Sequence, residues 1–386
     1  MKVTVSAGGT FHALRLAEQL ERRGLLHRLI STHPPMRGER IPRERVRFNP
    51  FPELLLRGPR ALRLTRGSGG DRFDYWKAVT FDRWAARHVG GCDLFVGFSL
   101  FSLISGRAAR ARGACTILDR GSTHVLTQRA LLTEEYRRWG VAGLPMDPRL
   151  VTRQLQEYDE ADYICVPSRF TLQSYLDHGV SRDRLLHVPY GVDLTNFSPA
   201  RTRGRPFRII ATGLGIRKGT PHLLDAVSRL RVPDVELWLV GESTPDLRGI
   251  LARSRTPFRQ LGKLSQAALA DAYRGASVFV LPSVEEGLAL VILEAMASGL
   301  PVVVTPNTGA EDIITDGREG LLVPAGDPDA LARALLSLYE DEDRRAAMSE
   351  AAVATASAWS WDAYGDRIAA AYARVVARQP SPDTQP

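Results

Sequence analysis

The sequence predicts an α/β protein in which two doubly wound, Rossmann-like domains face each other across a central cleft. Short apolar strand patterns alternate with helical patterns in two series, the first ending near Pro189 and the second beginning at Phe207. The segment between them is rich in proline, glycine and arginine, as domain joins often are. Alternating strands and helices form parallel sheets, and 386 residues suit two domains of ordinary size.

The predicted boundaries follow from these two series. We expect residues 1–190 and 191–360 to form the two domains, residues 361–378 to form a last helix, and residues 379–386 to be a flexible tail. The predicted strands cover residues 3–7, 93–98, 114–119, 162–168, 185–190, 207–213, 236–241, 258–262, 277–282, 301–305 and 320–323.

The composition excludes several classes of protein. Hydrophobic residues make up 44% of the chain, and no apolar run approaches the ~18 residues that a membrane span requires. Met1 leads directly into a strand, so we expect no signal peptide and a cytoplasmic location. Cys92, Cys115 and Cys165 are widely spaced, which predicts buried thiols with neither disulfides nor a metal site.

The net charge of +8 indicates an acidic partner. Nucleotide phosphates, an anionic membrane surface and nucleic acid all fit the charge. Nine arginines lie between Arg37 and Arg66, interleaved with large apolar side chains, which is the chemistry of an interfacial segment. The alternative is a solvated loop and helix with ordinary surface arginines. Nucleic acid is not expected, because no recognised module or stacking platform accompanies the charge.

Two polar or glycine-rich turns follow strands of the first domain. Gly8 and Gly9 end the first strand, where glycines let a ligand approach the backbone, although such a turn is also ordinary strand-to-helix geometry. His124 closes the polar loop after the strand that ends at Asp119. We weigh two interpretations of this histidine, one in which it faces a substrate and one in which it caps a helix.

The second domain centres on the stretch Pro282–Thr305. Glu294 is the one carboxylate among the apolar residues of a predicted buried helix, and an unpaired buried charge costs several kcal/mol, so Glu294 requires a partner. The loop from Glu286 to Ala289 precedes that helix, whose N-terminus suits an anion such as a phosphate. An ordinary α/β core helix with glutamates paired to arginine or backbone is the alternative.

A second loop carries two cations. Arg217 and Lys218 stand between Gly215 and Gly219, after a predicted strand and before a helix. This position at the carboxyl end of a strand suits the binding of a diphosphate.

With these motifs placed, the chain resembles the retaining glycosyltransferases of the GT-B fold in family 4, which use nucleotide sugars. The resemblance spans nearly the whole chain and is clearest between residues 162 and 325. The motifs that carry it are Gly8-Gly9, Pro189-Tyr190-Gly191-Val192-Asp193 with Phe197, Arg217-Lys218-Gly219, and Glu286 with Glu294 as an E-x(7)-E pair.

The resemblance implies a role for each matching residue. Glu294 would bind the ribose hydroxyls of the nucleotide and so gain the partner that it requires. Glu286 would lie near the donor sugar, and Lys218 would hold the diphosphate. The other implied roles are donor contacts by Gly8, Gly9, Arg217 and the N–H groups of Leu290 and Val291, base contacts around Lys263 and Leu264, a sugar contact by His124, and a last helix that crosses back onto the first domain.

The implied reaction is front-face transfer of a hexose with retention, in which the leaving phosphate oxygen accepts the proton of the acceptor hydroxyl. The donor would be a nucleotide diphosphate sugar, with UDP as the expected nucleotide and with no metal or other cofactor. The first domain would bind the acceptor, a glycan or a lipid-linked hydroxyl, at the inner face of the membrane. Electrostatic stabilisation and domain closure would supply most of the catalysis.

Two departures from the family pattern keep another function open. Thr212-Gly213 replaces the usual Gly-Arg pair, and Leu288-Ala289 stands within a loop that is usually E-G-F-G. The alternative is a catalytically weak GT-B protein that binds a nucleotide sugar or a partner without turnover. A sugar-nucleotide epimerase of the same fold is disfavoured by the glutamate pair.

Overall fold

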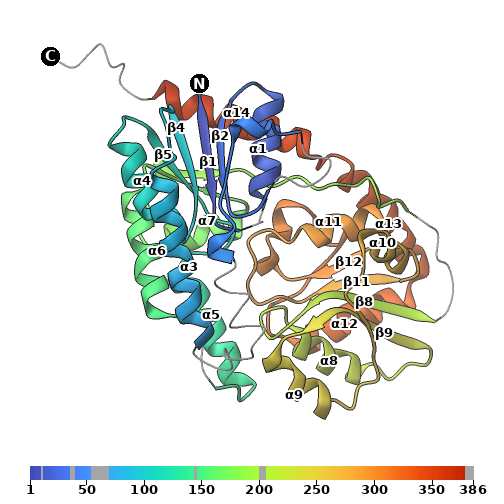
Figure 1. Cartoon of the computed structure of the whole chain (residues 1–386). Coiled ribbons are helices and arrows are strands. Elements are labelled where there is room, and N and C mark those ends of the chain that lie inside the picture. The colour runs from blue at the N-terminus through green and yellow to red at the C-terminus, as the bar shows by residue number, and fades with distance from the viewer. Residues whose placement is uncertain (10–11, 35–39, 54–68, 143–145, 200–205, 379–386) are drawn as a thin grey trace.

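The protein contains two parallel β-sheets, each packed between helices (Figure 1). The computed structural model describes residues 1–9, 12–34, 40–53, 69–142, 146–199 and 206–378. The first sheet has the order β3-β2-β1-β4-β5-β6-β7 and the second has the order β10-β9-β8-β11-β12-β13. This arrangement confirms the predicted fold class of two Rossmann-like domains.

The elements of the first domain alternate as the pattern predicts. They are β1 (Val3–Ala7), α1 (Ala13–Arg22), β2 (Leu26–Ser31), β3 (Val46–Phe48), α3 (Gly69–Ala86), β4 (Leu94–Phe98), α4 (Leu103–Arg110), β5 (Cys115–Asp119), α5 (Val125–Arg138), α6 (Pro148–Glu160), β6 (Tyr163–Val166), α7 (Arg169–Leu176) and β7 (Leu185–His187). Short 3-10 turns at residues 43–45 and 182–184 precede β3 and β7.

The second domain repeats the pattern. Its elements are β8 (Phe207–Leu214), α8 (Thr220–Arg229), β9 (Val235–Ser243), α9 (Pro245–Arg253), β10 (Arg259–Gly262), α10 (Gln266–Arg274), β11 (Val278–Leu281), α11 (Leu290–Ala297), β12 (Val302–Val304), β13 (Gly320–Leu322), α12 (Pro328–Glu340) and α13 (Glu342–Ala356). Two 3-10 turns, at residues 306–308 and 310–312, lie between β12 and β13.

The inner strands of both sheets are apolar along their whole length because helices cover both faces. Every residue of β4, β5, β11 and β12 is buried. Continuous apolar runs of this kind are typical of parallel sheets and account for their recognition from the sequence. The three cysteines are free and buried, as predicted.

The direction of winding reverses once in each sheet. The reversal lies between β1 and β4 in the first sheet and between β8 and β11 in the second. Loops leaving the carboxyl ends of such neighbouring strands diverge to opposite faces, which opens a crevice suited to ligands. The functional site of each domain is therefore expected beside these strand pairs.

The last helix, α14 (Trp361–Ala377), lies against the first domain although it follows the second (Figure 1). Arg22, the last residue of α1, and Arg23, which follows it, pair with Asp362 and Asp366 of α14. Gly365 permits this close approach, because a Cβ there would lie 2.3 Å from the Arg23 guanidinium. The helix thus joins the end of the chain to its first domain.

The strands β2 and β3 lie outside the predicted set. His27 and Arg28 interrupt the apolar pattern of β2, and β3 has only three residues. Both lie at or next to the open edge of the sheet, where polar side chains reach water. Of the arginine-rich segment, residues 37–39 and 54–66 lie outside the described residues, as does the expected tail at 379–386.

Candidate active site

Two loops of the second domain meet at the reversal between β8 and β11. The Nζ atom of Lys218 lies 2.7 Å from Oε1 of Glu286, and NH1 of Arg217 lies 2.9 Å from the same oxygen. The backbone N–H of Val284 donates to the Arg217 carbonyl at 2.9 Å, which fixes the two loops to each other. The structure thus brings together the cationic loop and the first glutamate, which are 68 residues apart in the chain.

Gly219 permits this approach of the loops. Its φ is +69°, in the left-handed region, and a Cβ would lie 1.9 Å from the carbonyl oxygen of Pro282. Any side chain would push the Lys218 loop away from the Glu286 loop. The glycine of the Arg217-Lys218-Gly219 motif is therefore required by sterics.

Gly213 also has a positive φ, of +70°. A Cβ at this residue would lie 3.2 Å from Cε of Lys218. An arginine at this position, as in the usual family pattern, would be strained and would crowd Lys218. The departure at Gly213 is thus matched to the local path of the backbone.

Glu294 lies in α11, on the helix that follows the Glu286 loop. Its side chain is half-buried, and among the described residues its carboxylate forms no hydrogen bond or ion pair. Burial raises the pKa of Glu294 to about 7, and the negative charge of Asp193 adds to the shift. The predicted need for a partner remains, because the described part of the protein does not supply one.

The N-terminus of α11 provides further hydrogen-bond donors. The residue before the helix, Ala289, has no side chain that caps it. The first N–H groups of a helix have no acceptor within the helix, so those of Leu290 and Val291 suit an anion. Both residues also pack against the main core, together with Leu264. Lys263 and Leu264 follow β10, two strands from β8 on the same edge of the sheet.

His124 is buried and lies at the N-terminus of α5. Its Nδ1 accepts a hydrogen bond from the N–H of Leu126 at 3.3 Å, which caps α5. The ring stacks on His178 at a centroid distance of 4.1 Å. Burial, with the charges of His178 and Arg120, lowers the pKa of His124 to about 4. The geometry favours the helix-capping interpretation over direct contact with a substrate.

Gly8 and Gly9 lie at the reversal of the first sheet. A Cβ on Gly8 would lie 2.1 Å from the ring of Phe101, which follows β4. Lys77 of α3 lies over the same ring at 5.8 Å and pairs with Glu53 at 2.5 Å. Gly8 therefore accommodates tight packing against Phe101, whose ring also lies beside the Lys77–Glu53 ion pair.

A functional residue that the sequence analysis did not single out is Glu285, directly before Glu286. Its side chain is fully buried and is contacted by Thr123 and Gln128 of the first domain. The sequence does contain a signal for Glu285: two consecutive glutamates follow an apolar strand, and a second buried carboxylate also needs partners. Only the tertiary structure shows that these partners come from the other domain.

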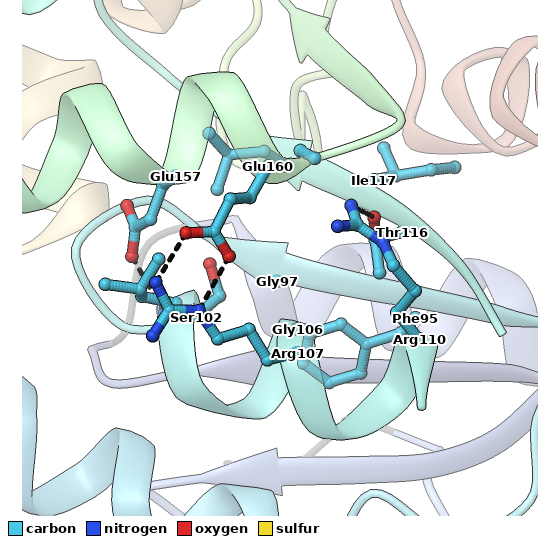
Figure 2. Close-up of a pocket in the computed structure, with 13 residues that line it drawn as sticks. Phe95, Gly97, Ser102, Gly106, Arg107, Arg110, Thr116, Ile117, Glu157 and Glu160 are labelled. Carbon is cyan, nitrogen blue, oxygen red and sulfur yellow. Dashed lines mark hydrogen bonds and ion pairs between the residues drawn. The ribbon is translucent and has the colours of Figure 1, made fainter. Parts of the chain in front are cut away.

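A separate small pocket of the first domain lies between α4, α6 and the neighbouring strands (Figure 2). Burial raises the pKa of Glu157 to about 7, yet its carboxylate accepts from the N–H groups of Leu100 and Ser102 at 2.6 and 3.0 Å. Arg107 binds both oxygens of Glu160, at 2.5 and 2.7 Å. Both carboxylates at this pocket are thus held by protein groups, whereas the buried hydroxyl of Ser102 has no hydrogen-bond partner among the described residues. Because its carboxylates are already paired, we assign the pocket to the structure of the domain.

Within the described ranges, no group of three or more His, Cys, Asp or Glu side chains is arranged to hold a metal ion.

Comparison with known families decides what kind of protein carries this site. Residues 6–196 match the family model described as Glycosyltransferase Family 4, and residues 206–341 match the model described as Glycosyl transferases group 1. The chain belongs to glycosyltransferase family 4. The resemblance drawn from the sequence motifs is thereby confirmed.

Two curated relatives of this glycosyltransferase are named as mannosyltransferases of phosphatidylinositol compounds. A GDP-mannose-dependent monoacylated alpha-(1-6)-phosphatidylinositol monomannoside mannosyltransferase of Corynebacterium glutamicum is 31% identical over 236 residues, covering 54% of this chain and 61% of the relative. A phosphatidyl-myo-inositol mannosyltransferase of Mycobacterium tuberculosis is 35% identical over 206 residues, covering 50% of this chain and 54% of the relative. The matches thus span less than two thirds of these relatives.

Solved structures agree on the fold of the glycosyltransferase. Sucrose-phosphate synthase from Thermosynechococcus elongatus has a TM-score of 0.72 at 21% identity, covering 98% of this chain and 100% of that one. HepE of Anabaena, in complex with UDP, has a TM-score of 0.70 at 16% identity, covering 97% and 100%. At these identities the likeness shows the GT-B fold, as predicted.

Proposed function

We propose that this glycosyltransferase moves a hexose from a nucleotide diphosphate donor to a hydroxyl acceptor, with retention of the anomeric configuration and without a metal ion. The observation that carries the proposal is the pairing of Lys218 with Glu286, followed in the next helix by Glu294, which has no partner among the described residues. A nucleotide diphosphate sugar offers phosphate oxygens to the cation and ribose hydroxyls to the carboxylate.

The diphosphate fits between Lys218 and the N-terminus of α11. Lys218 is about one-quarter exposed, so its ammonium is accessible while it is held by Glu286. The N–H groups of Leu290 and Val291 approach from the helix end, where the helix dipole also favours negative charge. These groups stabilise the leaving diphosphate as its charge grows, which lowers the barrier to transfer.

The state of Glu286 favours front-face transfer as the route to retention. Its carboxylate lies within 2.9 Å of two cationic side chains, which lowers its power as a nucleophile. A covalent sugar–carboxylate intermediate is therefore disfavoured. In the proposed reaction the leaving phosphate oxygen accepts the proton of the acceptor hydroxyl on the same face of the sugar.

The acceptor is proposed to be a lipid-linked hydroxyl, as in the two mannosyltransferase relatives. Large aromatic side chains are exposed on the first domain: Phe48 at 42%, Phe51 at 56% and Trp76 at 53%. The ion pair between Glu53 and Lys77 holds the segment after β3 against α3, which brings the elements of Phe51 and Trp76 together. Exposed aromatics beside arginines suit the interface of an anionic membrane.

None of the helices in the described part of the chain combines the length and the apolar character needed to cross a bilayer.

The donor has two supported candidates. A UDP sugar is the donor expected from the family resemblance, and GDP-mannose is the donor named for the Corynebacterium relative. Both candidates share the diphosphate and the ribose, which would bind to Lys218, Glu294 and the N-terminus of α11. The nucleotide base, in which the candidates differ, would bind near Lys263 and Leu264.

Nucleotide-sugar binding without turnover is the second candidate function. It is favoured by the occupation of both cations, since Arg217 and Lys218 already contact Glu286. In that case the donor binds but no sugar is released or transferred.

A donor panel tests the proposal. The protein is screened by thermal shift against UDP-glucose, UDP-galactose and GDP-mannose, and the best donor is incubated with phosphatidylinositol vesicles in the presence of EDTA. Proton NMR of the fresh product should show a retained anomer. Inversion, or loss of turnover on chelation, contradicts the proposal, and binding without any turnover supports the second candidate.

A further inference from the structure

The carboxylate of Glu285 is enclosed by groups from both domains. Oε1 accepts hydrogen bonds from the N–H of Thr123 at 3.1 Å and from its hydroxyl at 2.9 Å. Oε2 accepts from the side-chain amide of Gln128 at 3.0 Å. These three donors belong to the first domain, whereas Glu285 belongs to the second.

Glu285 is also linked to the cationic loop of its own domain. NH1 of Arg217 donates to the backbone carbonyl of Glu285 at 2.8 Å and lies 3.6 Å from its Oε2. The same NH1 lies 2.9 Å from the carboxylate of Glu286. One guanidinium nitrogen is thus held jointly by two consecutive glutamates, and its orientation depends on both.

The loop that carries both glutamates is clamped by the first domain at a second point. The carbonyl of Gly287 accepts a hydrogen bond from the hydroxyl of Ser168 at 2.6 Å. On its other side Gly287 lies so close to Gly121 that a Cβ would be 1.9 Å from the Gly121 carbonyl. The first domain therefore holds this loop in addition to the hydrogen bonds that Glu286 and Ala289 form with Asn307 and Thr308 of the second domain.

Separation of the domains would remove every first-domain donor from the Glu285 carboxylate. Charge-assisted hydrogen bonds of this kind contribute more than neutral ones, and a carboxylate without partners is unfavourable in a buried site. The hydrogen bonds to Glu285 therefore stabilise the closed arrangement, in which the two domains are in contact. Glu285 itself is fully buried, so it does not contact the donor.

We propose that Glu285 is a positioning residue that couples closure of the first domain to the placement of Arg217 and Glu286 at the donor site. The inference rests on the proposed function, in which Arg217 and Glu286 adjoin the donor. The two adjacent glutamates have separate tasks: Glu286 is directed to the donor and its cations, and Glu285 to Thr123 and Gln128 of the acceptor-side domain.

A double-mutant cycle tests the coupling. The variants are Glu285→Gln, which keeps the shape but removes the charge, Thr123→Val, which removes the hydroxyl donor, and the two combined. Donor affinity is measured by calorimetry with whichever of UDP-glucose and GDP-mannose the wild-type protein binds, and kcat is measured with phosphatidylinositol vesicles. Small-angle scattering gives the radius of gyration of each variant.

Each single change should lower kcat by about tenfold or more. The affinity for the nucleotide sugar should change by less than about threefold, because the groups proposed to bind it lie on the second domain. The double variant should be no worse than the poorer single variant, since both changes break one contact. The radius of gyration of Glu285→Gln should exceed that of the wild type. Arg138→Gln is the matched control: it removes a hydrogen bond to the Gly326 carbonyl that also joins the domains, and kcat should change little.

Additive effects of the two changes, an unchanged kcat, or equal losses of kcat and donor affinity would overturn the proposal. Scattering separates it from the proposed function. If the wild-type protein neither binds nor transfers any sugar, the proposed function fails, yet a larger radius of gyration in Glu285→Gln still supports the closure contact. If the protein is inactive and the two radii of gyration are equal, the proposed closure contact of Glu285 is overturned as well.

Discussion

The ammonium of Lys218 and the carboxylate of Glu286 form an ion pair with a separation of 2.7 Å at the point where the winding of the second sheet reverses. Arg217 shares the same carboxylate oxygen. The buried carboxylate of Glu285 lies 3.6 Å from the same guanidinium, so the two cations face two consecutive carboxylates. The cations of the proposed donor site are therefore already held in place before any ligand binds.

Arg217→Ala should lower kcat/KM by roughly 10- to 100-fold and approach the effect of Lys218→Ala. A charge-assisted hydrogen bond to phosphate contributes roughly 1.5 to 3 kcal/mol. NH1 of Arg217 is anchored by the two glutamates, and we expect the other N–H groups of the guanidinium to bind the diphosphate. Arg217→Lys should recover only part of the activity because the planar fork is lost. Steady-state kinetics with the best donor measure this, with Arg253→Ala as an exposed control on α9. A change of less than about threefold, under ~0.7 kcal/mol, would make Arg217 a structural link only.

Donor affinity should weaken as the pH falls from 8 to 6. The pKa of Glu294 is about 7 in the unliganded protein, so below that pH the side chain is protonated and loses its capacity to accept two ribose hydroxyls. Calorimetric titrations with the intact nucleotide sugar measure the dependence, since the terminal phosphate of a free diphosphate itself titrates near ~6. Glu294→Gln should bind more weakly at pH 8 and show a flat profile. A wild-type profile that is equally flat contradicts the assignment.

The same carboxylate should limit the stability of the unliganded protein. The folded-state pKa of Glu294 lies above the ordinary value of 4.5, so its contribution is most favourable below that pH and is lost as the pH rises through 7. Glu294→Gln should therefore raise Tm at pH 8 and change it little at pH 5. Differential scanning calorimetry at the two pH values checks this, and a lower Tm at pH 8 would show that Glu294 has a stabilising partner.

Gly219→Ala should impair the donor site and destabilise the protein by more than ~1 kcal/mol. The substitution meets both a positive φ and the Pro282 carbonyl at 1.9 Å, so the Lys218 loop must shift. Gly249→Ala is a matched control because this residue is exposed within α9 and its Cβ would meet only Arg253, at 3.5 Å. The control should gain roughly 0.4–1 kcal/mol. Urea denaturation and donor affinity are the measurements, and similar behaviour of the two variants would refute the steric explanation.

Exposed aromatics of the first domain should support binding to anionic vesicles. Replacing Phe51 and Trp76 together by alanine should reduce co-sedimentation with phosphatidylinositol-rich liposomes several-fold, because each is more than half exposed. Binding of the wild-type protein should also weaken with salt as screening grows. Leu126→Ala, on α5, is an exposed apolar control. Equal binding to neutral and anionic vesicles would remove the electrostatic component.

The sequence by itself determined the two-domain α/β fold, because inner strands of parallel sheets are apolar on both faces and helices keep a regular apolar period. It also singled out the residues of the proposed donor site. Glu294 stood out as a carboxylate without a partner, and Arg217 with Lys218 stood out as cations at the end of a strand. Such features depend on local patterns and on the cost of buried charge, both of which are readable from the chain.

The tertiary structure decided which groups meet. It placed Lys218 against Glu286, assigned Glu285 to partners in the other domain, and enclosed His124 among aromatic rings as a helix cap. These outcomes depend on strand order, on the reversal between β8 and β11, and on contact between two domains whose residues lie far apart in the chain. Local periodicity carries no information about such long-range pairings, because the same pattern of strands permits many spatial orders.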